Sequence, residues 1–291
     1  GMLVIPENFY RDLLLGKQPT LSYAGDASYF LVYGKVAKGL AMAGATLAAE
    51  VKVLRLLSEG QALAAAKEQH TAIPLNLRPV FNVTTGYINY VVPAVFILIL
   101  HQTLLIGIGL LGSGQNELRE SGKTGYWLVV PAWKLVTARS FVFLIIYLIL
   151  AMYYFGFCYD YYGITRLAQP LQLIQVAIPF LLATTLMGIC ISQFLPRREL
   201  ATMLVILSSL PIVFTAGFIW PSAMLPLPLY AISQLIPAIP GIQIFLQLNQ
   251  MGAEFYQLRP LWLQLWMQVL LYGVLACWLL RRKTTSKIVM V

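Results

Sequence analysis

The side chains that could perform chemistry in this sequence are few and widely spaced. The chain has two histidines, His70 and His101, and three cysteines, Cys158, Cys190 and Cys277, with neither a paired spacing nor a metal-ligand pattern. An enzyme would need His, Asp or Glu gathered near one segment. We therefore predict no catalytic, cofactor-binding or metal-binding residue, and interpret the cysteines as small hydrophobic side chains.

The densest group of charged and polar side chains lies at residues 112–139, which read GSGQNELRESGKTGYWLVVPAWKLVTAR. Glu117 and Glu120 are three residues apart and would share one face of a helix. Gly122 and Gly125 should break that helix. Side chains in this pattern could bind a charged partner surface. The competing interpretation is an ordinary loop with solvated charges.

The second half of this segment is amphipathic. We expect residues 126–138 to form a helix that lies along a membrane surface. Trp127 and Trp133 would sit at the interface, and Lys134 and Arg139 would point toward lipid headgroups.

Composition points to the elements that must position these side chains. Of 291 residues, 59% are hydrophobic and 11% charged, whereas soluble domains carry about 25% charged residues. Each of five stretches without a charge could hold the roughly 20 residues that cross a bilayer as a helix. They are residues 79–116, 140–159, 167–196, 200–253 and 260–280.

We therefore predict an α-helical polytopic membrane protein with about five visible spans. They lie near residues 88–111, 140–158, 171–194, 200–220 and 261–280. The loops on one side of these spans hold ten Lys and Arg residues, and those on the other side hold only Arg166 and Arg259. The basic side, which includes the C-terminus, should be cytoplasmic. This placement accounts for the net charge of +9 without a nucleic-acid partner.

Residues 1–85 carry a different pattern and are predicted to form a small α/β domain, followed by the transmembrane domain at residues 86–291. Strands or extended segments are expected at residues 2–6, 17–24 and 73–81, and helices at 7–16, 28–58 and 61–70. The first strand should be buried, and Ser28 should cap the long helix.

Five spans separate residues 1–85 from the cytoplasmic C-terminus. An odd number of crossings places residues 1–85 on the opposite side of the membrane, as an extracytoplasmic domain. A domain outside must be exported by a preceding segment. We therefore expect a first span upstream of Gly1 and six spans in the intact protein.

The stretch at residues 216–253 is almost as apolar as a span but contains five prolines, which break helices. We predict an outer re-entrant segment over residues 221–258, with short helices sheltered by the bundle. The competing interpretation is a sixth visible span near residues 223–250. It would place the basic residues 281–283 outside, against the charge pattern.

Three stretches, in this order, resemble the ABC-2 type permease family, the membrane subunits of ATP-binding-cassette exporters. LVIPENFYRDLLLGK at residues 3–17 resembles the start of the external domain that larger members insert between their first two spans. ELRESGKTGYWLVVPAWKLVTAR at residues 117–139 resembles the cytoplasmic segment, between spans two and three, that leads into a coupling helix. AGFIWPSAMLPLPLYAISQLIP at residues 216–237 resembles the signature after span five, and residues 251–253 its usual close.

The resemblance supplies two sets of candidate functional residues. The set expected to dock the ATPase is Glu117, Glu120, Lys123, Gly125, Tyr126, Trp133 and Lys134. The set expected in the outer re-entrant motif is Gly217, Phe218, Pro221, Met224, Pro226 and Pro237.

The resemblance also implies partners and a location in a bacterial inner (plasma) membrane. ATP and Mg²⁺ would be bound by a separate cytoplasmic ABC ATPase, and this sequence has no G-x-x-x-x-G-K-[ST] loop of its own. A second permease half, from a homodimer or a paralogue, would complete the path, within membrane lipid. A periplasmic adaptor protein could bind the external domain.

The substrate expected for such a path is amphiphilic or hydrophobic, such as a drug, a lipid or a lipid-linked molecule, because the predicted spans contain no Asp, Glu, Lys or Arg. A proton-coupled transporter would need intramembrane carboxylates. A non-transporting assembly or sensory subunit with an external ligand-binding domain stays open. Within the first span, we expect His101 to be a hydrogen-bonded interior residue, and Gly107, Gly109 and Gly112 to allow close helix packing.

Overall fold

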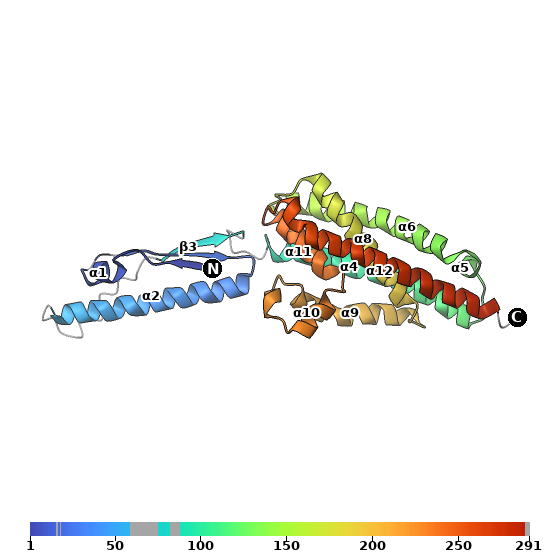
Figure 1. Cartoon of the computed structure of the whole chain (residues 1–291), viewed down its shortest axis with the longest axis horizontal. Coiled ribbons are helices and arrows are strands. Elements are labelled where there is room, and N and C mark those ends of the chain that lie inside the picture. Colours follow the sequence, from blue (N-terminus) through green and yellow to red (C-terminus); the bar gives the residue numbers. More distant parts are fainter. Residues whose placement is uncertain (16, 18, 59–74, 82–87, 289–291) are drawn as a thin grey trace. The chain divides into compact units, whose positions relative to one another are not determined.

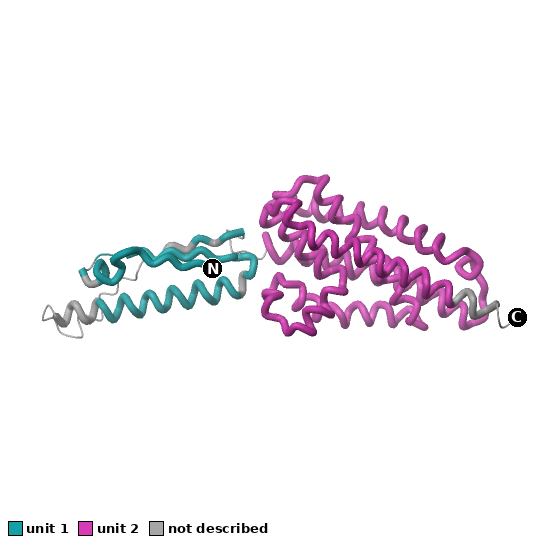
Figure 2. Tube along the Cα trace, in the orientation of Figure 1, with its two compact units in different colours: residues 1–86 teal, residues 87–291 magenta. Residues whose placement is uncertain are grey.

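The structure is a computed structural model. It describes residues 1–291 except 16, 18, 59–74, 82–87 and 289–291. The helix expected at residues 61–70 lies outside the described residues. The chain divides into two compact units, residues 1–86 and 87–291 (Figure 2).

Unit 1 contains a three-stranded sheet in the order β1-β2-β3. β1 (Met2–Val4) pairs antiparallel with β2 (Leu21–Asp26), and α1 (Phe9–Leu14) lies between them in sequence. β3 (Leu75–Val80) pairs parallel with β2. Because a parallel pair needs a long crossover, the connection from β2 to β3 has room for α2 (Phe30–Ser58).

The core of unit 1 forms where α2 packs against β2 and β3. Tyr23, Ala27, Tyr33 and Ala37 are buried together. The rings of Tyr23 and Tyr33 stack with their centroids 5.9 Å apart. This core is small because α2 is rich in alanine and glycine, which offer little apolar area to bury.

Two expectations for unit 1 were wrong. The first strand is exposed rather than buried, with Met2 63% exposed, because β1 lies at the sheet edge and α2 packs on the other two strands. The long helix begins at Phe30, beyond Ser28. The Ser28 N–H and hydroxyl both donate to the Asp26 carboxylate, which forms a turn before the helix.

Among its described residues, unit 2 contains five helices that are long and apolar enough to cross a membrane, and each overlaps one predicted span. They are α4 (Val91–Glu120), α6 (Ala132–Met152), α8 (Pro170–Ser192), α9 (Arg198–Thr215) and α12 (Phe255–Ile288). The helical polytopic class is therefore confirmed. Shorter elements connect them (Figure 1): α5 (Tyr126–Val129), a π-helix (Tyr153–Cys158), α7 (Tyr159–Tyr161), a 3₁₀ turn (Ser222–Met224), α10 (Leu227–Ser233) and α11 (Ala238–Asn249).

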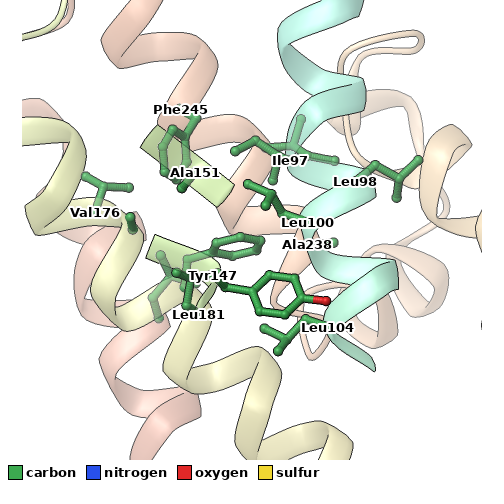
Figure 3. Close-up of a cluster of buried hydrophobic side chains, with 14 of the residues drawn as sticks. Ile97, Leu98, Leu100, Leu104, Tyr147, Ala151, Val176, Leu181, Ala238 and Phe245 are labelled. Atoms are coloured by element: carbon green, nitrogen blue, oxygen red, sulfur yellow. The ribbon is translucent and has the colours of Figure 1, made fainter. Parts of the chain in front are cut away.

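The centre of unit 2 is built on α4 and α8. In the most apolar segment of each helix, 56% of the residues are buried for α4 and 67% for α8. The corresponding share is 22% for α6 and for α9, and 28% for α12. Figure 3 shows side chains from four helices converging there, including Leu100 of α4, Tyr147 of α6, Leu181 of α8 and Phe245 of α11. The outer helices therefore leave broad apolar faces for lipid.

The glycines of α4 allow the close packing that was predicted. A Cβ atom at Gly109 would lie 2.8 Å from the Cβ of Ala201 on α9, and one at Gly112 would overlap the Ser192 hydroxyl of α8. At both positions, any side chain larger than that of glycine would push α4 away from its neighbour, α9 or α8.

His101 is an interior residue, but the hydrogen bond expected for it was wrong. Its side chain is fully buried, and neither ring nitrogen has a partner among the described residues. The buried residues one helical turn away, Ile97 and Leu104, belong to the apolar core. This side of α4 therefore faces hydrophobic neighbours.

We predict that Gly109→Ala lowers the stability of the bundle by about 1–3 kcal/mol, because the added methyl group would meet Ala201. Thermal unfolding in detergent measures the effect. Gly156→Ala is the matched control, because a Cβ there would meet no heavy atom within 4 Å. Adding Ala201→Gly to Gly109→Ala should restore the melting temperature. Equal melting temperatures for Gly109→Ala and the control would contradict this packing.

Candidate functional sites at the two ends of unit 2

α4 ends in a glycine-centred turn. Gly122 has a φ of +78°, a left-handed conformation that glycine adopts without strain. The Gly122 N–H donates to the Arg119 carbonyl at 3.1 Å, and the Lys123 N–H donates to the Leu118 carbonyl at 2.9 Å. These two bonds satisfy carbonyls at the helix end in a Schellman motif. The helix expected around Glu117 and Glu120 and its break at Gly122 are confirmed, but residues 112–120 continue the span helix rather than forming part of a separate loop.

The single surface helix expected over residues 126–138 was wrong. The structure has a short helix, α5 (Tyr126–Val129), and α6 begins at Ala132. Pro131 separates them because it has no N–H to donate and disfavours helical backbone at the residue before it. Val130 is accordingly extended, with a ψ of 135°. The surface segment is thus shorter, and the following span starts earlier, than predicted.

The predicted docking residues lie on the end of α4, the turn after it, α5 and the first turn of α6. They are Glu117, Glu120, Lys123, Gly125, Tyr126, Trp133 and Lys134. All are exposed except Gly125, which is half-buried beneath the Trp127 ring. The Lys134 ammonium lies 5.5 Å from the centre of the Trp133 ring. A compact chain segment therefore presents acidic, basic and aromatic side chains to its surroundings.

Polar contacts join this segment to its neighbours. The Glu117 carboxylate lies 3.5 Å from the Arg198 guanidinium at the start of α9. The Gln115 side chain accepts a bond from Arg139 at 2.5 Å and donates one to the Tyr126 hydroxyl at 3.3 Å. Arg139 is only 8% exposed, so its expected direction toward headgroups was wrong. The early start of α6 places Arg139 inside the bundle, where Gln115 of α4 binds it.

A buried asparagine, which was not singled out from the sequence, ties α4 to the end of α8. The Asn116 side-chain amide donates to the Ser192 carbonyl at 2.8 Å and to the Leu195 carbonyl at 2.9 Å. Gly114 permits the close approach of Arg198, since a Cβ there would lie 2.6 Å from the Arg198 Nε atom. Small residues next to an asparagine near a helix end were the available signal for this clamp.

A broken pair of helices, α10 and α11, follows α9. The two helix axes meet at 85° across a break of at most four residues. Three prolines of the predicted motif each stand directly before an element: Pro221 before the 3₁₀ turn, Pro226 before α10 and Pro237 before α11. Proline is tolerated there because the first N–H groups of a helix have no partner within it. The short helices predicted for this segment are present. Their bend fits either a broken span or a re-entrant loop, so the re-entrant path stays a prediction.

The other predicted residues of this motif lie at the start of the segment. Gly217 has a φ of +87°, and Phe218 beside it is 1% exposed and belongs to the core. Met224, in contrast, is 61% exposed. The motif thus joins a buried anchor to an exposed turn.

Three side chains of α12 bind the carbonyl groups at the break. Gln264 and Gln268 donate to the Gln234 carbonyl at 3.1 and 2.7 Å, and the Tyr272 hydroxyl donates to the Leu235 carbonyl at 2.6 Å. The donors are four residues apart and therefore share one face of α12. A broken backbone at membrane depth requires such protein partners. Sequence reasoning missed this row, whose only signal was its four-residue spacing.

These two sites lie at opposite ends of unit 2. Figure 1 shows α5 near the C-terminal end of α12, and α10 and α11 at the other end. The described residues contain no group of three His, Cys, Asp or Glu side chains that could hold a metal ion. A helical membrane bundle with an exposed charged turn at one end and a broken helix pair at the other belongs to the class of polytopic membrane proteins.

Comparison with known proteins identifies the family. The family model described as ABC-2 family transporter protein matches residues 1–278, which is most of the chain, so the chain belongs to this family. No curated protein and no solved structure matches the chain. Members of this family are membrane components of transport and are not themselves catalytic. Membership also implies an association with an ABC ATPase.

We predict that Gln268→Leu loosens the break between α10 and α11, because it leaves the Gln234 carbonyl with one donor fewer. The expected loss of stability is about 0.5–2 kcal/mol, and amide hydrogen exchange should become faster across residues 229–237. Gln175→Leu is the matched control, because Gln175 is exposed on α8. Unchanged exchange in Gln268→Leu would show that this bond does not hold the bend.

Proposed function

We propose that the chain is the membrane-spanning permease subunit of an ATP-binding-cassette exporter. It moves an amphiphilic or hydrophobic substrate (a drug, lipid or lipid-linked molecule) outward, using ATP that a separate cytoplasmic subunit binds with Mg²⁺ and hydrolyses. The observation that carries the proposal is the family match over residues 1–278. The exposed charged turn and the broken helix pair at opposite ends of unit 2 give such a permease one surface to receive force and another to open.

In this proposal, the α4–α6 turn and the C-terminus are cytoplasmic, in a bacterial inner membrane, and unit 1 is extracytoplasmic. The support is the distribution of basic residues. Ten lie on the side of the turn, and the two on the other side are Arg166 and Arg259. Arg166 is at the outer end, where its guanidinium donates to the Phe155 carbonyl at 3.0 Å and lies 3.7 Å from Asp160.

The proposed ATPase-docking surface consists of the exposed residues of the α4–α6 turn. Glu117 and Glu120 project from the last turn of α4, and Trp133 and Lys134 from the first turn of α6. Acidic, basic and aromatic groups close together provide the electrostatic complementarity and the anchors that protein interfaces use. The surface is made of helix ends that are fixed to the bundle, so a partner that moves it moves the helices.

Movement of the docking surface would reach the outer end through α4. This helix is continuous over 30 residues and packs against α8, α9 and α11. Near its C-terminal end, α4 is bonded to the end of α8 by the Asn116 side chain. Elsewhere along its length, α4 contacts α11 of the broken pair. A packed helix transmits displacement as a rigid body because the surrounding core resists local compression.

The proposal includes further partners in the membrane. A second permease half, identical or paralogous, would complete the path. The outward face of α9 suits lipid or a partner helix, since Leu207 is 73% and Leu210 68% exposed. A periplasmic adaptor protein would bind unit 1.

The orientation is tested by cysteine labelling in a variant whose three native cysteines are replaced by serine or alanine. A cysteine introduced at Tyr10 should react with a membrane-impermeant maleimide added to spheroplasts. A cysteine introduced at Lys283 should react only after the membrane is permeabilised. Labelling of the Lys283→Cys variant in intact spheroplasts would reverse the proposed topology.

The docking surface is tested by charge reversal. The double variant Glu120→Lys, Lys134→Glu should reduce the amount of ATPase that copurifies with the chain by at least about tenfold, because like charges would then face the partner. Any ATPase still recovered should show hydrolysis that is uncoupled from export.

The control is Glu254→Lys, which makes the same change as Glu120→Lys but between α11 and α12. It should leave ATPase recovery unchanged. Wild-type recovery and wild-type hydrolysis in the double variant would refute the docking surface. Failure of any ATPase to copurify with the wild-type chain would instead favour a non-transporting membrane subunit.

A further inference from the structure

A groove of about 640 Å³ runs between α6, α8 and α12 in the half of unit 2 that contains α5. Its walls are almost entirely apolar, with Val136 from α6, Leu186 from α8 and Val274 from α12 among them. Its volume falls within the range of about 300–1,000 Å³ that is usual for ligand sites. The groove begins one turn of α6 beyond the docking residues Trp133 and Lys134, whose carbonyls accept hydrogen bonds from the Thr137 hydroxyl in its wall. It is lined by none of the docking residues and by no residue of the broken helix pair.

The groove opens onto the lipid-facing surface. Leu270 and Val274, which line it, are 69% and 72% exposed. Both α6 and α12 are among the least buried helices of the bundle. A mouth lined by exposed apolar side chains on a membrane-spanning helix faces hydrocarbon in the proposed orientation, which favours an apolar occupant over a polar solute.

Gly273 leaves space in the middle of the groove. It lines the wall on α12, and a Cβ there would lie 3.7 Å from the nearest atom, a methyl group of Leu186. A larger side chain at this position would extend into the groove without a clash at its Cβ. The shape suits a flexible apolar chain.

One polar group in the wall has no partner. Ser140 is 7% exposed, and its hydroxyl makes no hydrogen bond among the described residues. Several other hydroxyls in the spans donate to a carbonyl one turn earlier in their own helix, as Thr184 and Thr185 do. The Ser140 hydroxyl is thus available to an acceptor, such as the ester carbonyl of a lipid.

The end of the groove is strongly basic. Arg281 lines it, and the Arg282 guanidinium lies 5.6 Å from the centre of the Trp278 ring, which also lines it. Lys283 and Lys287 follow in the sequence. Four basic residues directly after a span attract anionic lipid, and a tryptophan beside them matches the level of the headgroups.

We infer that this groove binds an anionic phospholipid of the cytoplasmic leaflet, with an acyl chain between α6, α8 and α12 and its phosphate at Arg281 and Arg282. The lipid would fill a lateral surface of the bundle that no described helix covers. The leaflet assignment rests on the orientation proposed above. The binding itself needs neither an ATPase nor a transport substrate.

The test uses the fluorescence of Trp278 in vesicles. The chain is reconstituted with its other five tryptophans replaced by phenylalanine, in mixtures of brominated phosphatidylglycerol and phosphatidylcholine. Bromine on the acyl chain quenches a tryptophan that it contacts. We expect phosphatidylglycerol to bind at least about fivefold more tightly than phosphatidylcholine, the preference that about one well-placed basic residue supplies, and we expect salt to reduce the preference.

Three variants separate a built site from general contact with lipid. Arg281→Gln should reduce the preference about fivefold, whereas Arg281→Lys should keep it. Gly273→Leu should abolish the preference by filling the groove. Arg259→Gln, the same change near the other end of α12, is the control and should behave as the parent.

The inference is overturned if both lipids quench Trp278 equally, or if Arg281→Gln and Arg259→Gln give the same preference. Melting temperatures of all variants are compared with that of the parent, so that loss of fold is distinguished from loss of binding. Because no ATPase is present, failure here would leave the proposed transport function standing, and failure of ATPase copurification would leave this site standing.

Discussion

The fold of unit 2 depends on one constraint: backbone groups within hydrocarbon must be bonded by the protein itself. The break between α10 and α11 frees carbonyls at Gln234 and Leu235, and α12 supplies donors for both. α12 can do so because it is fixed on α8, where the Trp262 indole donates to the Gln175 carbonyl at 3.1 Å. The position of α12 therefore decides where a helix pair bent by 85° is stable.

The same constraint explains why the central helices differ from the outer ones. α4 and α8 bury most of their apolar residues against protein, so their close contacts depend on small residues such as Gly109 and on buried donors such as Asn116. The outer helices have lipid as their neighbour and need no such fit. The central helices therefore form a rigid element that joins the two ends of unit 2. The outer helices are not constrained in this way, so their side chains, such as Trp278 and Arg281, can form a surface that binds lipid.

Local sequence signals carried much of the architecture. Five spans were predictable because an apolar, uncharged stretch of about 20 residues has the length and composition of a helix that crosses a bilayer. The helix end at Gly122 followed from its left-handed backbone, and the short outer helices followed from the positions of the prolines. Pro131 was an equally local signal that was overlooked, and with it the early start of α6. These features depend on a few adjacent residues and hold in almost any surroundings.

What the tertiary structure decided concerns partners that are distant in sequence. Arg139, which α6 carries into the bundle, is bound there by Gln115 of another helix. His101 has no partner among the described residues because its neighbours are apolar. The row of Gln264, Gln268 and Tyr272 acquires meaning only beside the break that it stabilises. The sequence by itself determined which segments prefer hydrocarbon and where the backbone must turn, since these are properties of the chain alone. Only the packing of the helices determined which polar groups meet. Sequence periodicity predicts the face of a helix on which a side chain lies, but it does not predict which other helix packs against that face.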